Sequence, residues 1–407
     1  MENYRFKRIF VLVMDSLGIG YMSDADKYFN GNSSDKGANT LLHIANSLKN
    51  GLSIPTLNKL GIGDLDNIKG TNIVKHPHSY ILKSNEKSVG KDTMTGHFEM
   101  MGVYTTKPYK TFTDNGFPKE LIKELENKTG HKIIGNKAAS GTAIIKELGE
   151  EQMKDNALIV YTSADSVLQI AAHEEVTGLN ELYRCCMVAR EICMQEEYKV
   201  GRIIARPYIG ENKNNFKRVV AHRHDLALKP DVPTVMNILQ NNNFNVSCIG
   251  KISDIFDGYG VNESQKTGSN YEGMIKTINE ARQKDYKGLC FINLVEFDSE
   301  YGHRRDVKGY AKAIEEFDTQ LEELISVLKN DDLLIITADH GNDPTWDGTD
   351  HTREKVPLII YNKKFKYGRY LKTRETFADI GATILKNFHL DKPEYLLGEA
   401  INELFTE

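Results

Sequence analysis

Leu-Leu-Ile-Ile-Thr-Ala-Asp-His-Gly, residues 333–341, is the stretch of sequence that decides the fold. Its first five residues are apolar or β-branched, a run that is typical of a strand buried on both faces of a parallel sheet. The run ends in Asp339 and His340, two side chains that can bind metal ions. Ligands bind beyond the carboxyl ends of the strands in open α/β sheets. The stretch therefore predicts a parallel α/β fold with a polar site at one edge of its sheet.

Two other apolar runs end in the same way. Residues 9–14 run into Asp15, and residues 289–297 run into Asp298, with His303 following shortly after. Because parallel strands present their carboxyl ends at one edge of the sheet, we expect the three strand ends to share a rim. The candidate site residues at that rim are Asp15, Asp298, His303, Asp339, His340 and, from the loop before residue 356, His351.

The rest of the chain alternates apolar runs with amphipathic stretches, the pattern of an α/β protein. Further parallel strands are predicted at 157–161, 202–205, 246–249 and 356–361, and helices at 118–129, 179–197, 232–241, 271–283 and 307–328. Turn-rich segments near 105–115 and 228–233 bracket a self-contained βα pattern. We therefore expect a core built from residues 1–106 and 229–407, with a domain of residues 107–228 inserted into it.

Composition restricts the function. The 407 residues carry a net charge of −5, which argues against a protein that binds nucleic acid or a membrane surface. Between residues 199 and 229, however, eight Lys or Arg residues stand against two acids, a balance that suits a small anion.

The five cysteines form no C-x-x-C pair, and no apolar run is long enough for a signal peptide or a membrane span. A cytoplasmic protein with reduced thiols is the expectation.

Three carboxylates at one rim repel one another and need a compensating positive charge. Histidines are mixed with the aspartates and the cysteines lie elsewhere, so divalent metal ions are the expected partners. Mn²⁺, Mg²⁺, Fe²⁺ and Zn²⁺ all accept such oxygen and imidazole ligands. A single aspartate at a strand end is more often a helix cap or a turn residue. Three such strand ends together favour a metal site.

Val-Gly-Lys-Asp-Thr-Met-Thr-Gly-His, residues 89–97, places two hydroxyls in a glycine-flanked turn. A threonine hydroxyl becomes a nucleophile when a metal ion or a base removes its proton. Thr93 and Thr95 are both candidates for this role, and their spacing does not choose between them. The alternative is structural, because a threonine at this point can simply cap the start of a helix.

Five motifs follow one another along the chain: Val-Met-Asp-Ser-Leu-Gly-Ile-Gly (13–20), Gly-Lys-Asp-Thr-Met-Thr-Gly-His (90–97), Phe-Asp-Ser-Glu-Tyr-Gly-His-Arg-Arg-Asp (297–306), Thr-Ala-Asp-His-Gly-Asn-Asp-Pro (337–344) and Thr-Asp-His-Thr-Arg-Glu (349–354). Together they resemble the phosphopentomutase family of the alkaline phosphatase superfamily. Asp-His-Gly alone would indicate the superfamily, whereas residues 90–97 and the middle segments 161–166 and 204–210 narrow the resemblance to the mutases. The resemblance implies an alkaline-phosphatase-like core, whose central, mostly parallel sheet is flanked by helices, and a smaller inserted α/β cap domain.

The resemblance also implies roles for individual residues. Two Mn²⁺ ions would be bound, one by Asp15, Asp339, His340 and the Thr93 oxygen, the other by Asp298, His303 and His351. Thr93 would carry the phosphoryl group, loaded by a sugar bisphosphate such as glucose 1,6-bisphosphate. The residues that would face the sugar phosphate are Ser163, Asp165, Arg206 and Lys251.

The implied activity is that of an isomerase that converts ribose 1-phosphate or 2-deoxyribose 1-phosphate to the 5-phosphate through a bisphosphate, linking nucleoside catabolism to the pentose phosphate pathway. Small pentose phosphates are the expected partners, with no nucleic acid, membrane or obligate protein partner. The alternatives are another metal-dependent phosphomutase, such as a phosphoglycerate mutase, a phosphomonoesterase, or an inactive phosphosugar-binding protein. His222, Leu226 and Glu296 depart from the family pattern, which leaves the cap contacts beyond Arg206 open.

Overall fold

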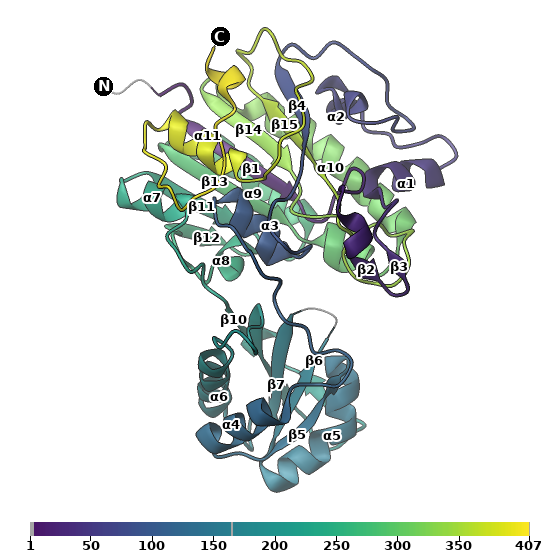
Figure 1. Cartoon of the computed structure of the whole chain (residues 1–407), viewed down its shortest axis with the longest axis vertical. Helices are drawn as coiled ribbons and strands as arrows, with labels where there is room; N and C mark the ends of the chain where they lie inside the picture. Colours follow the sequence, from purple (N-terminus) through teal and green to yellow (C-terminus); the bar gives the residue numbers. More distant parts are fainter. Residues whose placement is uncertain (1–3, 164–165, 407) are drawn as a thin grey trace. The chain divides into compact units, whose positions relative to one another are not determined.

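The computed structural model describes residues 4–163 and 166–406, and the chain divides into two compact units (Figure 1). The first unit contains Met1–Lys107 and Pro230–Glu407, and the second contains Pro108–Lys229. The boundaries expected from the sequence, 106/107 and 228/229, each lie one residue before these positions. No helix within the described ranges is both long and apolar enough to cross a membrane.

The first unit is built on a seven-stranded sheet with the order β12-β11-β13-β1-β14-β15-β4. These strands are β12 (Glu263–Gln265), β11 (Asn245–Ile249), β13 (Gly288–Leu294), β1 (Arg8–Met14), β14 (Asp332–Thr337), β15 (Val356–Tyr361) and β4 (Ser79–Ser84). The strands from β12 to β14 are parallel, whereas β15 and β4 are antiparallel to their neighbours. The fully buried strands β1 and β13 lie side by side near the middle of the sheet.

Helices flank this sheet in two groups (Figure 1). One group contains α1 (Thr40–Ser47), α2 (Pro55–Lys59), α9 (Asn270–Gln283) and α10 (Val307–Val327). The other contains α3 (Thr93–Met100), α7 (Val235–Asn241), α8 (Ile252–Ile255) and α11 (Asp379–Asn387). The predicted α/β core with a central, mostly parallel sheet is confirmed.

The second unit has its own mixed sheet, with the order β10-β8-β7-β6-β5 and β9 paired to β8. Its strands are β5 (Ile133–Ala138), β6 (Leu158–Thr162), β7 (Val167–His173), β8 (Arg202–Ile209), β9 (Lys217–Arg218) and β10 (His224–Ala227). The helices are α4 (Lys119–Thr129), α5 (Gly141–Asp155) and α6 (Leu179–Ile192). Two separate apolar clusters form its core, one beneath α4 and α6 and the other beneath α5.

Four details of the sequence prediction are wrong. Strand β15 is antiparallel, because residues 338–355, all of which the structure describes, contain no helix that could form the crossover a parallel neighbour needs. Strand β13 ends at Leu294, and residues 297–302 instead form one π-helical turn. Helix α6 ends at Ile192 rather than at residue 197. Strand β6 is parallel to β5 but antiparallel to β7.

Candidate active site

A first group of metal-binding side chains lies at the carboxyl ends of β1 and β14. Asp15 follows β1, and Asp339 and His340 follow β14 after Ala338. Since β1 and β14 pair in parallel with Val13 opposite Thr337, the two strands deliver these residues to the same point. All three are almost fully buried, and their ligand atoms lie within 4.8 Å of one another. The Nε2 atom of His340 lies 3.5 Å from Asp15 Oδ1 and 3.4 Å from Asp339 Oδ2.

A second group contains Asp298, His303 and His351. The π-helical turn at 297–302 aligns the first two, since the His303 amide donates to the Asp298 carbonyl five residues earlier. Asp298 Oδ2 lies 3.0 Å from His303 Nε2 and 3.5 Å from His351 Nε2, and the two Nε2 atoms are 3.1 Å apart. The rings of His340 and His351 lie 4.0 Å apart, so the two groups adjoin.

Neighbouring carbonyls set the tautomers of two of these histidines. His340 Nδ1 lies 3.0 Å from the Gly341 carbonyl, and His303 Nδ1 lies 2.7 Å from the Thr349 carbonyl. A carbonyl only accepts hydrogen bonds, so each Nδ1 carries the proton and donates it. This arrangement turns each Nε2 toward the carboxylates of its group, and Nε2 is then the nitrogen that can bind a metal ion.

The charges of the first group are not balanced by its own residues. Burial, together with Asp339 and Asp298, raises the pKa of Asp15 to about 7. Burial disfavours charge on His340, but the nearby carboxylates Asp339, Asp298 and Asp15 outweigh it and raise the pKa of that ring to about 9. In the described part of the chain, Asp15 Oδ1 and Asp339 Oδ2 are buried and accept no hydrogen bond. Buried carboxylate oxygens that accept no hydrogen bond, close to the imidazole Nε2 of His340, fit a divalent cation that would displace a proton from that ring.

Thr93 lies beside this first group, at the first residue of α3. Asp92 is the N-cap, and its Oδ1 accepts a hydrogen bond from the Thr95 amide at 3.1 Å. Thr93 Oγ1 lies 3.3 Å from His340 Nε2. The Thr95 hydroxyl instead donates to Asp92 Oδ2 at 2.6 Å, and Thr95 is fully buried. Of the two candidate threonines, Thr93 is therefore the one whose hydroxyl adjoins the first group.

Three polar residues that the sequence reasoning missed support the two groups. Asn293 Nδ2 donates to Asp15 Oδ2 at 2.9 Å, and Asn342 Nδ2 donates to Asp298 Oδ1 at 2.7 Å. His97 Nδ1 lies 3.2 Å from Asp339 Oδ2. A buried asparagine inside the apolar run 289–294 is a usable sequence signal, because a buried amide needs partners.

The residues predicted to face the sugar phosphate lie in both units. Arg206 is in β8, where its Nε donates to Gln169 Oε1 at 2.9 Å. Burial, followed by the nearby Arg223, lowers the pKa of Arg206, so an anion would be favoured beside it. Ser163 follows β6 in the same unit, Lys251 follows β11 in the first unit, and Asp165 lies outside the described residues.

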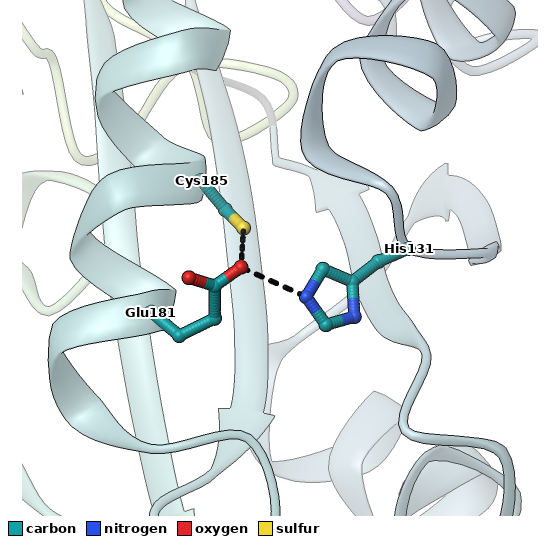
Figure 2. Close-up of side chains that lie close together, drawn as sticks. All are labelled: His131, Glu181 and Cys185. Carbon is teal, nitrogen blue, oxygen red and sulfur yellow. Dashed lines mark hydrogen bonds and ion pairs between the residues drawn. The ribbon is translucent and has the colours of Figure 1, made fainter.

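A third group of metal-type side chains occurs in the second unit, where Glu181 points toward His131 and Cys185 (Figure 2). Glu181 Oε1 lies 3.0 Å from His131 Nε2 and 3.6 Å from Cys185 Sγ. Both oxygens of this carboxylate also accept hydrogen bonds from Arg184, at 2.6 and 2.8 Å. Burial, followed by the charge of Glu181, raises the pKa of the Cys185 thiol to about 12. An internal arginine already balances this group, unlike the two in the first unit.

The fold and the two acidic groups define a metalloenzyme, and a family model described as the metalloenzyme superfamily matches residues 7–392. The chain is 54% identical over 399 residues to a protein named phosphopentomutase from Clostridium botulinum (strain Alaska E43 / Type E3), covering 98% of this chain and 99% of that one. It is 55% identical over 397 residues to a phosphopentomutase of Clostridium perfringens (strain 13 / Type A), covering 98% of both chains. The chain belongs to the phosphopentomutase family.

Among solved structures, the chain is similar to the PH0037 protein from Pyrococcus horikoshii, at 13% sequence identity and a TM-score of 0.49. That comparison covers 96% of this chain and 99% of the other.

Proposed function

We propose that this protein is a phosphopentomutase that interconverts ribose 1-phosphate, or 2-deoxyribose 1-phosphate, and the corresponding 5-phosphate. The observation that carries the proposal is the position of Thr93, whose Oγ1 lies 3.3 Å from His340 Nε2 at the edge of the first acidic group. The family name of the close relatives supports the choice of pentose phosphates as substrates.

Two divalent ions, proposed to be Mn²⁺, would be held at the two groups. Asp15, Asp339, His340 and the Thr93 oxygen would bind one, and Asp298, His303 and His351 would bind the other. When bound, such ions lower the pKa of a coordinated hydroxyl and offset the negative charge on a transferring phosphoryl group. The Gly341 and Thr349 carbonyls bond the Nδ1 atoms of His340 and His303, so Nε2 is the nitrogen by which each ring would bind an ion.

Thr93 would act as a phosphoryl carrier. In the active enzyme, the 5-hydroxyl oxygen of ribose 1-phosphate bonds to the phosphorus of phospho-Thr93, the bond from phosphorus to Thr93 Oγ1 breaks, and the hydroxyl gives up its proton. Ribose 1,5-bisphosphate results. Thr93 Oγ1 then bonds to the phosphorus on position 1, the bond to the sugar O1 breaks, and O1 takes a proton. A sugar bisphosphate such as glucose 1,6-bisphosphate would load Thr93 at the start.

The position of Thr93 at the beginning of α3 suits this role. The first amides of a helix point outward and favour negative charge, so a phosphoryl group on Thr93 would lie at the positive end of α3. Asp92 leaves most of these amides free, since only the Thr95 amide donates to its side chain in the described structure.

The second unit would serve as a cap that binds the phosphate not being transferred. Arg206, with Ser163 and Asp165, is proposed to face that phosphate, and Lys251 is proposed to contribute from the first unit. Exclusion of water would keep phospho-Thr93 from being hydrolysed, which separates a mutase from a phosphatase with the same core.

The decisive experiment is intact-mass spectrometry with peptide mapping after incubation with Mn²⁺ and glucose 1,6-bisphosphate. We expect one added phosphate on Thr93 of the wild type and of Thr95→Val, and none on Thr93→Ala. Ribose 1-phosphate isomerisation should be lost in Thr93→Ala while the far-UV circular dichroism is unchanged. Full activity of Thr93→Ala would refute the covalent route.

Substrate choice is tested in parallel. The wild type should isomerise ribose 1-phosphate faster than 3-phosphoglycerate and release little inorganic phosphate. Preferential isomerisation of 3-phosphoglycerate would make the protein a phosphoglycerate mutase, and phosphate release as the main reaction would make it a phosphomonoesterase.

A further inference from the structure

The buried side chain of Arg353 joins two segments of the active site that are distant in sequence. Arg353 is 2% exposed and follows His351 by two residues. Its Nη1 donates to the Gly90 carbonyl at 2.5 Å, and its Nη2 donates to the Glu86 carbonyl at 3.0 Å. These two carbonyls belong to the loop that leads directly into Thr93. One guanidinium therefore connects the segment that bears His351 to the loop that bears Thr93.

Other contacts fix the guanidinium itself. Nη1 donates to Glu86 Oε2 at 2.6 Å, and Nε and Nη2 donate to the two oxygens of Asp24 at 3.3 and 3.1 Å. The ring of Tyr28 lies 4.7 Å from the guanidinium carbon. The Arg353 backbone is also held, because its amide donates to Asp35 Oδ2 at 3.0 Å. A planar group with this many partners has one orientation.

One other side chain of the loop reaches the His351 segment, since Lys91 Nζ lies 3.1 Å from Asp350 Oδ2. The backbone amides of the loop point elsewhere. The amides of Lys87 and Ser88 donate to Glu99, and the Val89 amide donates to the Thr105 carbonyl. These contacts tie the loop to α3, which itself begins at Thr93, and to the segment after α3. Two side chains then span the loop and the His351 segment. Lys91 does so through one ion pair to the partly exposed Asp350, whereas the buried Arg353 bonds two backbone carbonyls of the loop.

We infer that Arg353 is a positioning residue that sets the place of the Thr93 loop relative to the segment bearing His351, and thereby the rate of phosphoryl transfer. This inference rests on the proposed function. Reactions of this kind are sensitive to placement, since a shift of about 1 Å costs roughly 10²-fold in rate.

The test compares Arg353→Lys with Arg8→Lys. Lysine keeps the positive charge beside Glu86 but lacks the planar fork that reaches two carbonyls and a carboxylate together. Arg8 is a matched control, because it is fully buried and donates both to Asp332 and to the carbonyls of Glu280, Ala281 and Lys284. It lies at the amino end of β1, the opposite end from Asp15.

Both variants should lose thermal stability, and in Arg353→Lys the kcat for ribose 1-phosphate should also fall by about 10²-fold with little change in KM. Arg8→Lys should keep kcat within about twofold, as expected for substitutions away from a reacting centre. Hydrogen exchange should quicken at the amides of residues 87–89 in Arg353→Lys only. If Arg353→Lys has the same kcat and the same exchange pattern as Arg8→Lys, Arg353 has only a structural role and the inference is overturned.

A milder variant covers the case in which Arg353→Lys does not fold. Asp24→Asn, at a partly exposed side chain, loosens the guanidinium while keeping Arg353 itself. We expect a smaller fall in kcat, about threefold to tenfold, again with faster exchange at residues 87–89. Unchanged kcat and exchange in Asp24→Asn would contradict the inference. If the wild type does not isomerise ribose 1-phosphate, the proposed function fails, and the exchange comparison still decides whether Arg353 holds the loop.

Discussion

Replacing Gly96 with alanine should slow phosphoryl transfer far more than it destabilises the fold. Gly96 lies in the first turns of α3, and a Cβ built there would meet the Asp339 carbonyl oxygen at 2.1 Å. Real Cβ atoms essentially never approach another heavy atom closer than 3.0 Å. Helix α3 and the segment that follows β14 must therefore separate by about 0.9 Å. The obstructing atom belongs to the backbone of a proposed metal ligand and cannot swing aside. Thr93 and Asp339 would therefore move apart.

The expected magnitudes differ for rate and stability. A displacement close to 1 Å lowers kcat by about 10²-fold, which corresponds to roughly 2.7 kcal/mol of transition-state stabilisation. Overpacking costs about 1–3 kcal/mol of unfolding free energy, and alanine in place of a helical glycine returns up to about 1 kcal/mol. The variant should therefore remain folded while its catalysis is severely impaired.

The assay measures isomerisation of ribose 1-phosphate with saturating Mn²⁺, together with thermal unfolding. Gly273→Ala is the control, because Gly273 is also helical and its Cβ would meet Leu294 Cδ2 at 2.7 Å, the far end of a flexible side chain. That variant should keep kcat within about twofold, since only a side chain has to move. If Gly96→Ala retains wild-type kcat, the spacing between α3 and Asp339 does not control the reaction. If both variants lose kcat equally, the loss reflects packing in general.

Four further outcomes are expected. Asn342→Leu removes the hydrogen bond to Asp298 Oδ1 and should weaken Mn²⁺ binding, measured by titration calorimetry, by about 10-fold or more. An unchanged affinity for Mn²⁺ would show that Asn342 does not support the site. Chelation should abolish isomerisation and, because a bound ion stabilises the folded state, lower the melting temperature, and added Mn²⁺ should restore both. Activity that resists the chelator would contradict the metal proposal. Arg206→Lys should raise KM for ribose 1-phosphate by about 10-fold, since lysine cannot bind phosphate with a planar fork, and an unchanged KM would exclude this contact. Cys185→Ser should leave kcat and metal stoichiometry unchanged, because Arg184 already neutralises Glu181, and loss of a bound ion would reverse that assignment.

The central strands could be predicted because their signal is local. The runs 9–14 and 333–337 are apolar without interruption, and β1 and β14 are buried along their whole length. Strand β4 was missed because Ser-Tyr-Ile-Leu-Lys-Ser mixes polar and apolar residues, as suits an antiparallel strand at the edge of a sheet. The direction of β15 depends on the connection that precedes it, which the apolar run itself does not encode.

The candidate ligands could also be predicted, because all but His351 follow the end of an apolar run and His351 shortly precedes one. Their supporting partners could not. Asn342 matters because its amide reaches Asp298, which is 44 residues away, and Arg353 because its guanidinium reaches Gly90, which is 263 residues away. The alignment of Asp298 with His303 depends on a π-helical turn, for which Phe-Asp-Ser-Glu-Tyr-Gly carries no recognisable local signal. Such contacts follow from the tertiary fold alone.

A cation site differs from a structural cluster of the same side chains in whether its charge is already balanced within the protein. Arg184 donates two hydrogen bonds to the Glu181 carboxylate. These bonds are the largest of several causes that lower the pKa of Glu181 to about 2. Asp15 has no such partner, and its pKa moves in the opposite direction, to about 7. Ligand-type residues alone therefore do not define a cation site. In the described part of the first unit, Asp15 is buried beside Asp339 and accepts no hydrogen bond from an arginine, and an external cation would offset the cost of this buried charge.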